Sequence, residues 1–197
     1  KGQLPPSVAE LSIETCSSNH VIVVLRDSSQ AHKGFVQVGH VSEQGVVWGD
    51  LQPFSGESAA FGPVVTLFDN GKVVIAYRDK DRLGDGFMLG GQRNTSDGMS
   101  GLQIDLREPS KFARNQSQRM LMTSFSQSRA VLFYGNHATE SLGGVAVLLR
   151  TVQNGGVEIL AKRHFAQGYR VARFSATLLD RTSLVLAYRA LPIEEAE

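Results

Sequence analysis

The sequence contains a single cysteine, Cys16, among 197 residues, so no disulfide can form within the chain. A metal site built from several thiolates is excluded for the same reason. A lone cysteine in an alternating apolar segment is typical of a small core residue, so we expect Cys16 to be buried. A reactive or intermolecular thiol is the alternative. Long apolar runs are also lacking: the longest, residues 21–25, is far shorter than the roughly 20 residues of a membrane-spanning helix.

An excess of charge of either sign is absent too. Twenty basic and 19 acidic residues are scattered along the chain, and the formal net charge is +1. We therefore expect no nucleic acid and no acidic membrane among the partners. The 42% of hydrophobic and 20% of charged residues are typical of a folded globular chain rather than of disorder.

Sequence signatures of catalysis are lacking as well. The chain contains no Gly-x-Ser-x-Gly elbow, no His-Glu-x-x-His pair and no phosphate-binding glycine loop. The five histidines are spread along the chain without the spacing of metal ligands. We therefore predict no catalytic residues, no cofactor and no metal site.

The sequence does contain a repeated apolar segment. Residues 21–27, 73–79, 130–136 and 184–190 each form a valine-rich or leucine-rich run that ends in Leu or Tyr and two further residues. With Leu25, Tyr77, Tyr134 and Tyr188 taken as equivalent, the spacings are 52, 57 and 54 residues. Such regular self-similarity is typical of a protein built from repeated structural units.

The flanks of this segment repeat as well. A glycine opens a second apolar stretch in the first three copies, and a phenylalanine closes each unit. The glycines are Gly34, Gly86 and Gly144, and the phenylalanines are Phe54, Phe112 and Phe165. A polar turn precedes each core segment, and the Asn70-Gly71 pair predicts a two-residue hairpin loop. Each unit is therefore predicted to form four antiparallel strands, the size of one propeller blade.

These patterns predict an all-β protein, a propeller-like array of four-stranded antiparallel sheets with about 3.5 repeats. Residues 1–197 would form a single repeat domain with units at 8–54, 55–112, 113–165 and a partial 166–197, which has only two strands. The alternation predicts burial of six inner-strand side chains: Val23, Leu25, Val74, Ala76, Leu132 and Leu186.

The string Lys72-Val73-Val74-Ile75-Ala76-Tyr77-Arg78-Asp79, followed by Gly86, resembles a known degenerate repeat. The stretch from Gly34 to Trp48-Gly49 and Phe54 is similar to the rest of that unit. Such repeats of about 50 residues occur in bacterial, phage and unicellular algal surface and structural proteins. The resemblance implies propeller-like β-structure and carries no shared activity. For an algal source it would add a lumenal accessory subunit of a membrane complex to the candidate functions.

Two polar clusters are candidate sites. Asp79, Asp81 and Asp85 could present oxygens to Ca²⁺, although a solvated turn between strands is the favoured interpretation. Tyr77 and Arg78, together with the single tryptophan Trp48, could form a ligand platform, because aromatic rings and guanidinium groups stack on sugars or bases. A structural role in each unit is favoured, with the arginine bridging to the aspartate or to a neighbouring unit.

The favoured function is a non-catalytic β-scaffold or protein-interaction module, either a subunit of a larger assembly or part of a longer surface protein. A glycan-binding or adhesive module is the alternative, and an enzyme is disfavoured. The incomplete last unit predicts pairing with the N-terminal segment, with a second copy or with another protein. Glycosylation sequons at Asn94 and Asn115 favour a secreted, cell-surface or organelle-lumen location. The first residue, Lys1, fits a removed leader or a fragment.

Overall fold

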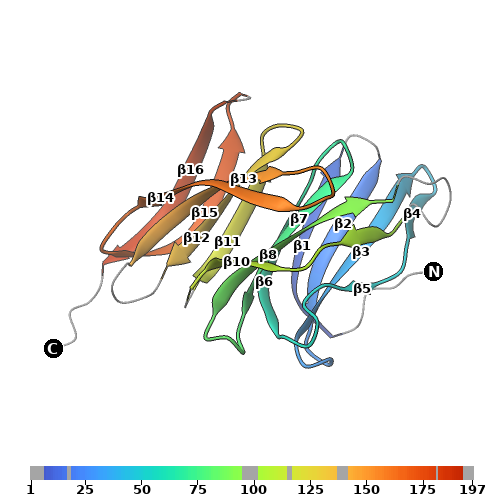
Figure 1. Ribbon diagram of the computed structural model, residues 1–197, viewed down its shortest axis with the longest axis horizontal. Coiled ribbons are helices and arrows are strands. Elements are labelled where there is room, and N and C mark those ends of the chain that lie inside the picture. Colours follow the sequence, from blue (N-terminus) through green and yellow to red (C-terminus); the bar gives the residue numbers. More distant parts are fainter. Residues whose placement is uncertain are drawn as a thin grey trace.

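The computed structural model describes residues 7–16, 19–94, 102–114, 117–136, 142–180 and 182–192. Four antiparallel sheets account for nearly all of these residues, which confirms the predicted all-β class. No α-helix occurs within the described ranges, and none of the described segments is a helix that could cross a membrane. Figure 1 shows the sheets packed one beside the next along the long axis of the molecule.

The first two sheets contain five strands each. The first consists of β1 (Val8–Cys16), β2 (His20–Asp27), β3 (Lys33–Ser42), β4 (Gly45–Trp48) and β5 (Gln52–Pro53). Its order is β1-β2-β3-β4, with β5 also beside β3. The second consists of β6 (Ala60–Leu67), β7 (Lys72–Asp79), β8 (Asp85–Arg93), β9 (Ile104–Leu106) and β10 (Ser110–Ala113). Its order is β6-β7-β8, with β9 and β10 both beside β8.

The last two sheets are simpler. The third is a meander in the order β11 (Ser117–Ser124), β12 (Arg129–Asn136), β13 (Gly143–Thr151) and β14 (Val157–Phe165). The last is a two-stranded hairpin of β15 (Tyr169–Leu178) and β16 (Leu184–Pro192). Within the described residues, nothing pairs with the outer edge of β16.

The predicted single fourth strand is wrong for the first two sheets, where it is divided in two. Pro109 lies between β9 and β10, and proline has no N–H to donate to a sheet ladder. In the first sheet, Gly49 lies in the break between β4 and β5. A Cβ built there would meet the backbone carbonyl of Leu102, just before β9 of the second sheet. The third sheet has neither obstacle, so β14 runs unbroken to Phe165.

The predicted two-residue loop at Asn70-Gly71 is also wrong. The Phe68 N–H donates to the Lys72 carbonyl (2.9 Å), so three residues, Asp69 to Gly71, form the loop between β6 and β7. Gly71 adopts a φ of +78°, the conformation that three-residue hairpin loops require at their last position. The asparagine acts through its side chain, because Asn70 Oδ1 accepts the Lys72 N–H (3.1 Å).

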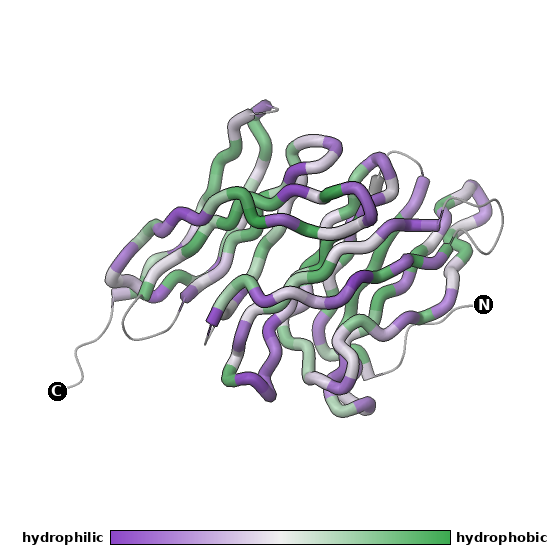
Figure 2. Tube along the Cα trace, viewed as in Figure 1, coloured by the Kyte–Doolittle hydropathy of each residue, from purple (hydrophilic) through white to green (hydrophobic). Residues whose placement is uncertain are grey.

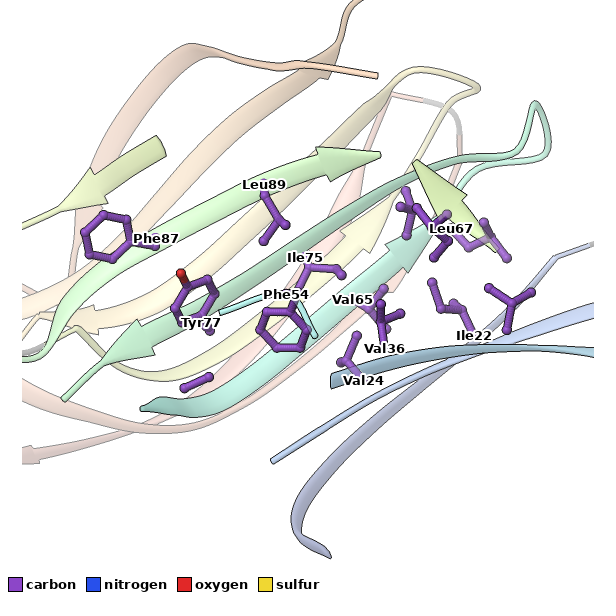
Figure 3. Close-up of a cluster of buried hydrophobic side chains, with 14 of the residues drawn as sticks. Ile22, Val24, Val36, Phe54, Val65, Leu67, Ile75, Tyr77, Phe87 and Leu89 are labelled. Atoms are coloured by element: carbon purple, nitrogen blue, oxygen red, sulfur yellow. The ribbon is translucent and has the colours of Figure 1, made fainter. Parts of the chain in front are cut away.

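The core lies between successive sheets. The first and second sheets bury one apolar cluster between them, part of which is labelled in Figure 3. The second and third sheets bury another. Because the middle sheets are covered on both faces, strands such as β7 are buried at almost every position rather than alternately buried and exposed. Figure 2 shows the same concentration of apolar residues along the central strands.

Five of the six side chains predicted to be buried are buried: Val23, Leu25, Val74, Ala76 and Leu132. The prediction for Leu186 is wrong, because this residue is only half-buried. It lies on β16, where the described residues supply no further strand to cover it. The side chain of Cys16 and the sequon at Asn115 lie outside the residues that the structure describes.

The first strands of the four sheets bring neighbouring sheets together: β1 contacts β6, β6 contacts β11, and β11 contacts β15. The first sheet and the last hairpin lie at opposite ends of the long axis (Figure 1). The described sheets therefore do not close into a ring, and each end of the row presents a sheet face that no other described sheet covers.

Candidate interaction surface

The same aromatic contact recurs between each sheet and the next. The phenylalanine that closes one sheet packs on the tyrosine at the end of the central strand of the following sheet. The pairs are Phe54 with Tyr77, Phe112 with Tyr134 and Phe165 with Tyr188, with ring centroids 5.4, 5.3 and 5.0 Å apart. Tilted and edge-on geometries of this kind add to the free energy of apolar burial. The last hairpin is therefore attached by the same contact as the inner sheets.

A glycine makes room for each phenylalanine. A Cβ built on the glycine near the start of the third strand would overlap the ring of the phenylalanine in the same sheet. The pairs are Gly34 with Phe54, Gly86 with Phe112 and Gly144 with Phe165. These glycines have no positive φ, so what they supply is space for the ring rather than backbone freedom.

The last hairpin carries the same side chains as the inner sheets in a different environment. Tyr77 and Tyr134 are 2% and 5% exposed, whereas Tyr188 is 42% exposed. Three residues earlier, Val74 and Val131 are 0% and 9% exposed, whereas Val185 is 47% exposed. In the second sheet, a third strand supplies Phe87, which stacks on Tyr77 at 6.0 Å. No described strand takes that place beside β16.

Two hollows border this hairpin, and Leu178 at the end of β15 lines both. One, of about 400 Å³, lies against Phe68 and Phe125, and the other, of about 340 Å³, lies against Phe125, Leu148 and Leu184. Leu178 is exposed, as is its neighbour Leu179. The side of the hairpin that carries Leu178 and Leu184 therefore borders the third sheet, whereas Val185, the next residue along β16, lies on the opposite side. We call Leu178, Leu179, Val185 and Tyr188 the hairpin surface.

The structure does not place Tyr77 and Arg78, the candidate ligand platform, side by side on an open surface. Tyr77 is buried between the first and second sheets, and burial, with a smaller effect from Asp79, raises the pKa of its phenol to about 12. The guanidinium of Arg78 lies 5.5 Å from the ring of Phe61 in its own sheet. Tyr77 therefore contributes to the core and does not face an external ligand.

The equivalent arginine of the first sheet connects two sheets. Arg26 Nε donates to Glu10 Oε2 (3.1 Å), and the same oxygen accepts the Gly62 N–H of the second sheet (2.6 Å). The Arg26 guanidinium also lies 4.1 Å from the ring centroid of Phe61. The sequence pattern identified the arginine, but Glu10 and Phe61 become its partners only when the sheets stack.

The carboxylates of the candidate calcium loop, for which a turn was the favoured interpretation, each have a protein partner. Asp79 is buried, accepts the Asp81 N–H (3.0 Å) and pairs with Arg82 (3.4 Å). Asp81 accepts a backbone N–H from the connection between β5 and β6 (3.0 Å), and Asp85 pairs with Lys111. Across the described ranges, no three His, Cys, Asp or Glu side chains gather closely enough to hold a metal ion. These carboxylate contacts stabilise the turn between β7 and β8.

Asp27, the equivalent of Asp79 in the first sheet, anchors its turn more strongly. Its carboxylate accepts hydrogen bonds from Ser7 Oγ, from the N–H (2.8 Å) and Oγ (2.7 Å) of Ser29, and from Gln30 Nε2 (3.0 Å). These donors lower the pKa of Asp27 to about 2, with the Ser7 hydroxyl having the largest effect. The carboxylate thus remains charged because the hydrogen-bond donors of the turn stabilise its ionised form.

Trp48, the third predicted platform residue, is half-buried on β4. Its indole packs on the face of the first sheet that points away from the second sheet, beside Val21, Val23 and Leu25. A Cβ built on Gly39 would meet the same ring at 2.8 Å, so Trp48 covers that glycine. The tryptophan completes a core cluster at the end of the row, where no further described sheet follows.

No protein-family model, curated protein or solved structure matches the chain. Its function is therefore inferred from its own residues. Sequence reasoning found Tyr188 and the incomplete last unit, and it missed Leu178 and Leu179. The 22 or 23 residues that separate each phenylalanine from its tyrosine were a signal that could have predicted the inter-sheet contact.

Proposed function

We propose that this chain is a non-catalytic, propeller-like β-scaffold that binds another protein through the outer edge of β16 and the hairpin surface. The observation that supports the proposal is the difference in exposure at equivalent positions. Val185 is 47% exposed where its equivalents in the second and third sheets are 0% and 9% exposed. The hairpin has the apolar sequence of an inner sheet and the solvent exposure of an end.

An incoming strand would satisfy two kinds of group at once. Backbone N–H and carbonyl groups on a free edge can pair with an added strand, and side-chain contacts then supply specificity. Burial of each large apolar side chain of the hairpin surface would contribute roughly 1.5–3 kcal/mol before the cost of ordering the partner. A strand of the protein partner would lie beside β16, in the position that β8 has beside β7 and β13 has beside β12.

The sequence of β16 leaves this edge open. Sheet edges that must remain free are normally protected by charged residues, proline or a bulge. From Leu184 to Tyr188 the strand carries no charge, and the first charged residue, Arg189, comes after the apolar run. The edge is therefore suited to pairing.

The test uses light scattering and hydrogen exchange on the full chain. A synthetic peptide of residues 143–151, the strand that pairs with β12, serves as the probe strand, and a scrambled peptide is its control. We expect either concentration-dependent association of the chain or protection of the β16 amides by the probe peptide. A chain that stays monomeric and takes up no peptide would contradict the proposal.

Two lysine variants locate the surface. Val185→Lys places a charge on the hairpin surface and should abolish association or peptide uptake. Leu83→Lys places the same charge on the turn between β7 and β8, at a leucine that is also exposed, and should change neither. Equal behaviour of the two variants would show that general hydrophobicity, not the β16 edge, causes association.

A further inference from the structure

A polar pocket of about 810 Å³ lies between the second and third sheets, well separated in sequence from the hairpin surface. Its volume is within the range of small-molecule binding sites. Residues at the start of β7, the end of β8 and β9 form one wall, and the turn between β13 and β14 forms the other. The charged lining residues are Lys72, Arg93, Asp105 and Arg107.

Two of the three cations in this pocket have no acidic partner among the residues that the structure describes. Arg107 pairs with Asp105 (3.0 Å) and donates from Nε to the Asn154 carbonyl (2.5 Å), so its charge is balanced and it links the two sheets. Lys72 and Arg93 form no ion pair with any described residue. The described lining therefore has a local excess of positive charge, although the net charge of the chain is only +1.

Arg93 also carries an unsatisfied donor. Its Nε is buried and has no hydrogen-bond partner among the described residues. A buried donor without an acceptor lowers the stability of the folded state, and such groups are uncommon in native proteins. An anionic ligand would accept from the terminal nitrogens of the Arg93 guanidinium, because Nε itself is buried.

The opposite wall supplies neutral groups. The side-chain amides of Gln153 and Asn154 line the pocket and make no hydrogen bond with the described residues. Each amide can donate to one hydroxyl and accept from another. The described lining contains no aromatic side chain, so a planar ring has no surface on which to stack.

The backbone holds the two walls close together. A Cβ built on Gly90 of β8 would overlap the carbonyl of Gly155 in the opposite turn, and Gly155 has a φ of +72°. The Arg107 N–H donates to the Gly90 carbonyl within the second sheet (2.9 Å), and its Nε donates to the Asn154 carbonyl of the opposite wall (2.5 Å). The cationic and amide walls are therefore fixed relative to one another before any ligand arrives, which lowers the ordering cost of binding.

From these observations we infer that the pocket binds an anionic saccharide. Its sulfate or carboxylate would lie at Lys72 and Arg93, and its hydroxyls at Gln153 and Asn154. This site goes beyond the scaffold role and does not depend on it, because it shares no residue with β16 or the hairpin surface.

Calorimetric titration tests the inference with four probes: a sulfated disaccharide, a uronic-acid disaccharide, a neutral disaccharide and inorganic sulfate. We expect one of the two anionic disaccharides to bind at least tenfold more tightly than the neutral disaccharide and than inorganic sulfate. Comparison of the sulfated with the uronic-acid disaccharide shows whether the ligand carries sulfate or carboxylate groups. Equal binding of the neutral sugar, or sulfate as tight as both anionic sugars, would overturn the inference.

Variants then assign the site. Lys72→Gln with Arg93→Gln should weaken binding of the preferred disaccharide at least tenfold. Arg163→Gln with Arg170→Gln removes the same charge from exposed positions on β14 and β15 and should weaken it less than twofold. Gln153→Ala with Asn154→Ala should weaken disaccharide binding while leaving sulfate binding unchanged. Equal losses in the two charge variants would refute this location, provided that circular dichroism shows both remain folded.

Discussion

The contact between Gly86 and Phe112 offers a direct measurement of how the sheets are held. A Cβ built on Gly86 would lie 2.5 Å from Cζ and 2.6 Å from Cε2 of the Phe112 ring. These distances are far inside van der Waals contact, so Gly86→Ala must displace either the ring or β8. Phe112 is buried, and its ring packs on Tyr134 of the next sheet, so the displacement would disturb the core between two sheets.

The magnitudes follow from known core substitutions. Overpacking by one methyl group costs about 1–3 kcal/mol of unfolding free energy, offset by about 0.4–1 kcal/mol because alanine restricts the unfolded chain. Phe112→Ala leaves a cavity and should cost about 3–5 kcal/mol. In the double variant the alanine methyl meets no ring, so the overpacking cost disappears. The double variant should therefore lose about 1–3 kcal/mol less than the two single losses combined.

Urea unfolding followed by circular dichroism and by Trp48 fluorescence gives the four free energies of this cycle. Gly86→Ala combined with Phe165→Ala is the matched control, because the Phe165 ring lies over Gly144 instead. That control should be additive within about 0.5 kcal/mol. Additive losses of unfolding free energy in the Gly86 and Phe112 pair would refute the conclusion that the absence of a side chain at Gly86 makes room for the Phe112 ring.

Two pH dependences follow from the same structure. The folded pKa of Asp27 is about 2, below its ordinary value of 3.8, so the stability it contributes is present above that value and is lost as the pH falls toward 2. Asp27→Asn should remove this part of acid unfolding, and an unchanged acid midpoint would contradict the assignment. Burial raises the pKa of Tyr77 and Tyr134 from 10.0 to about 12, so stability should fall as the pH rises between these values. Tyr77→Phe should reduce that alkaline loss, which absorbance at about 295 nm would follow as phenolate forms.

The sequence alone predicted the all-β class and the four repeated central strands, which the structure shows as β2, β7, β12 and β16. The two-residue period, the polar turns and the spacing of Leu25, Tyr77, Tyr134 and Tyr188 depend on local chain geometry, which neighbouring residues determine. The predictions of strand and loop boundaries that failed did so where a local residue conflicts with the repeat pattern. Pro109 interrupts the fourth strand of the second sheet, and the loop at Asn70 has one more residue than its dipeptide suggests.

Only the tertiary structure decided which surfaces remain exposed and which polar groups meet. Whether Val185 is buried depends on whether another sheet covers its face of the hairpin, as the third sheet covers Val74, and not on its own sequence context, which is almost that of Val74. The pocket joins Lys72 to Asn154 across two sheets, and no periodicity relates residues so far apart in the chain. Stacking of the sheets brings them together, because each sheet must bury its apolar face against the next.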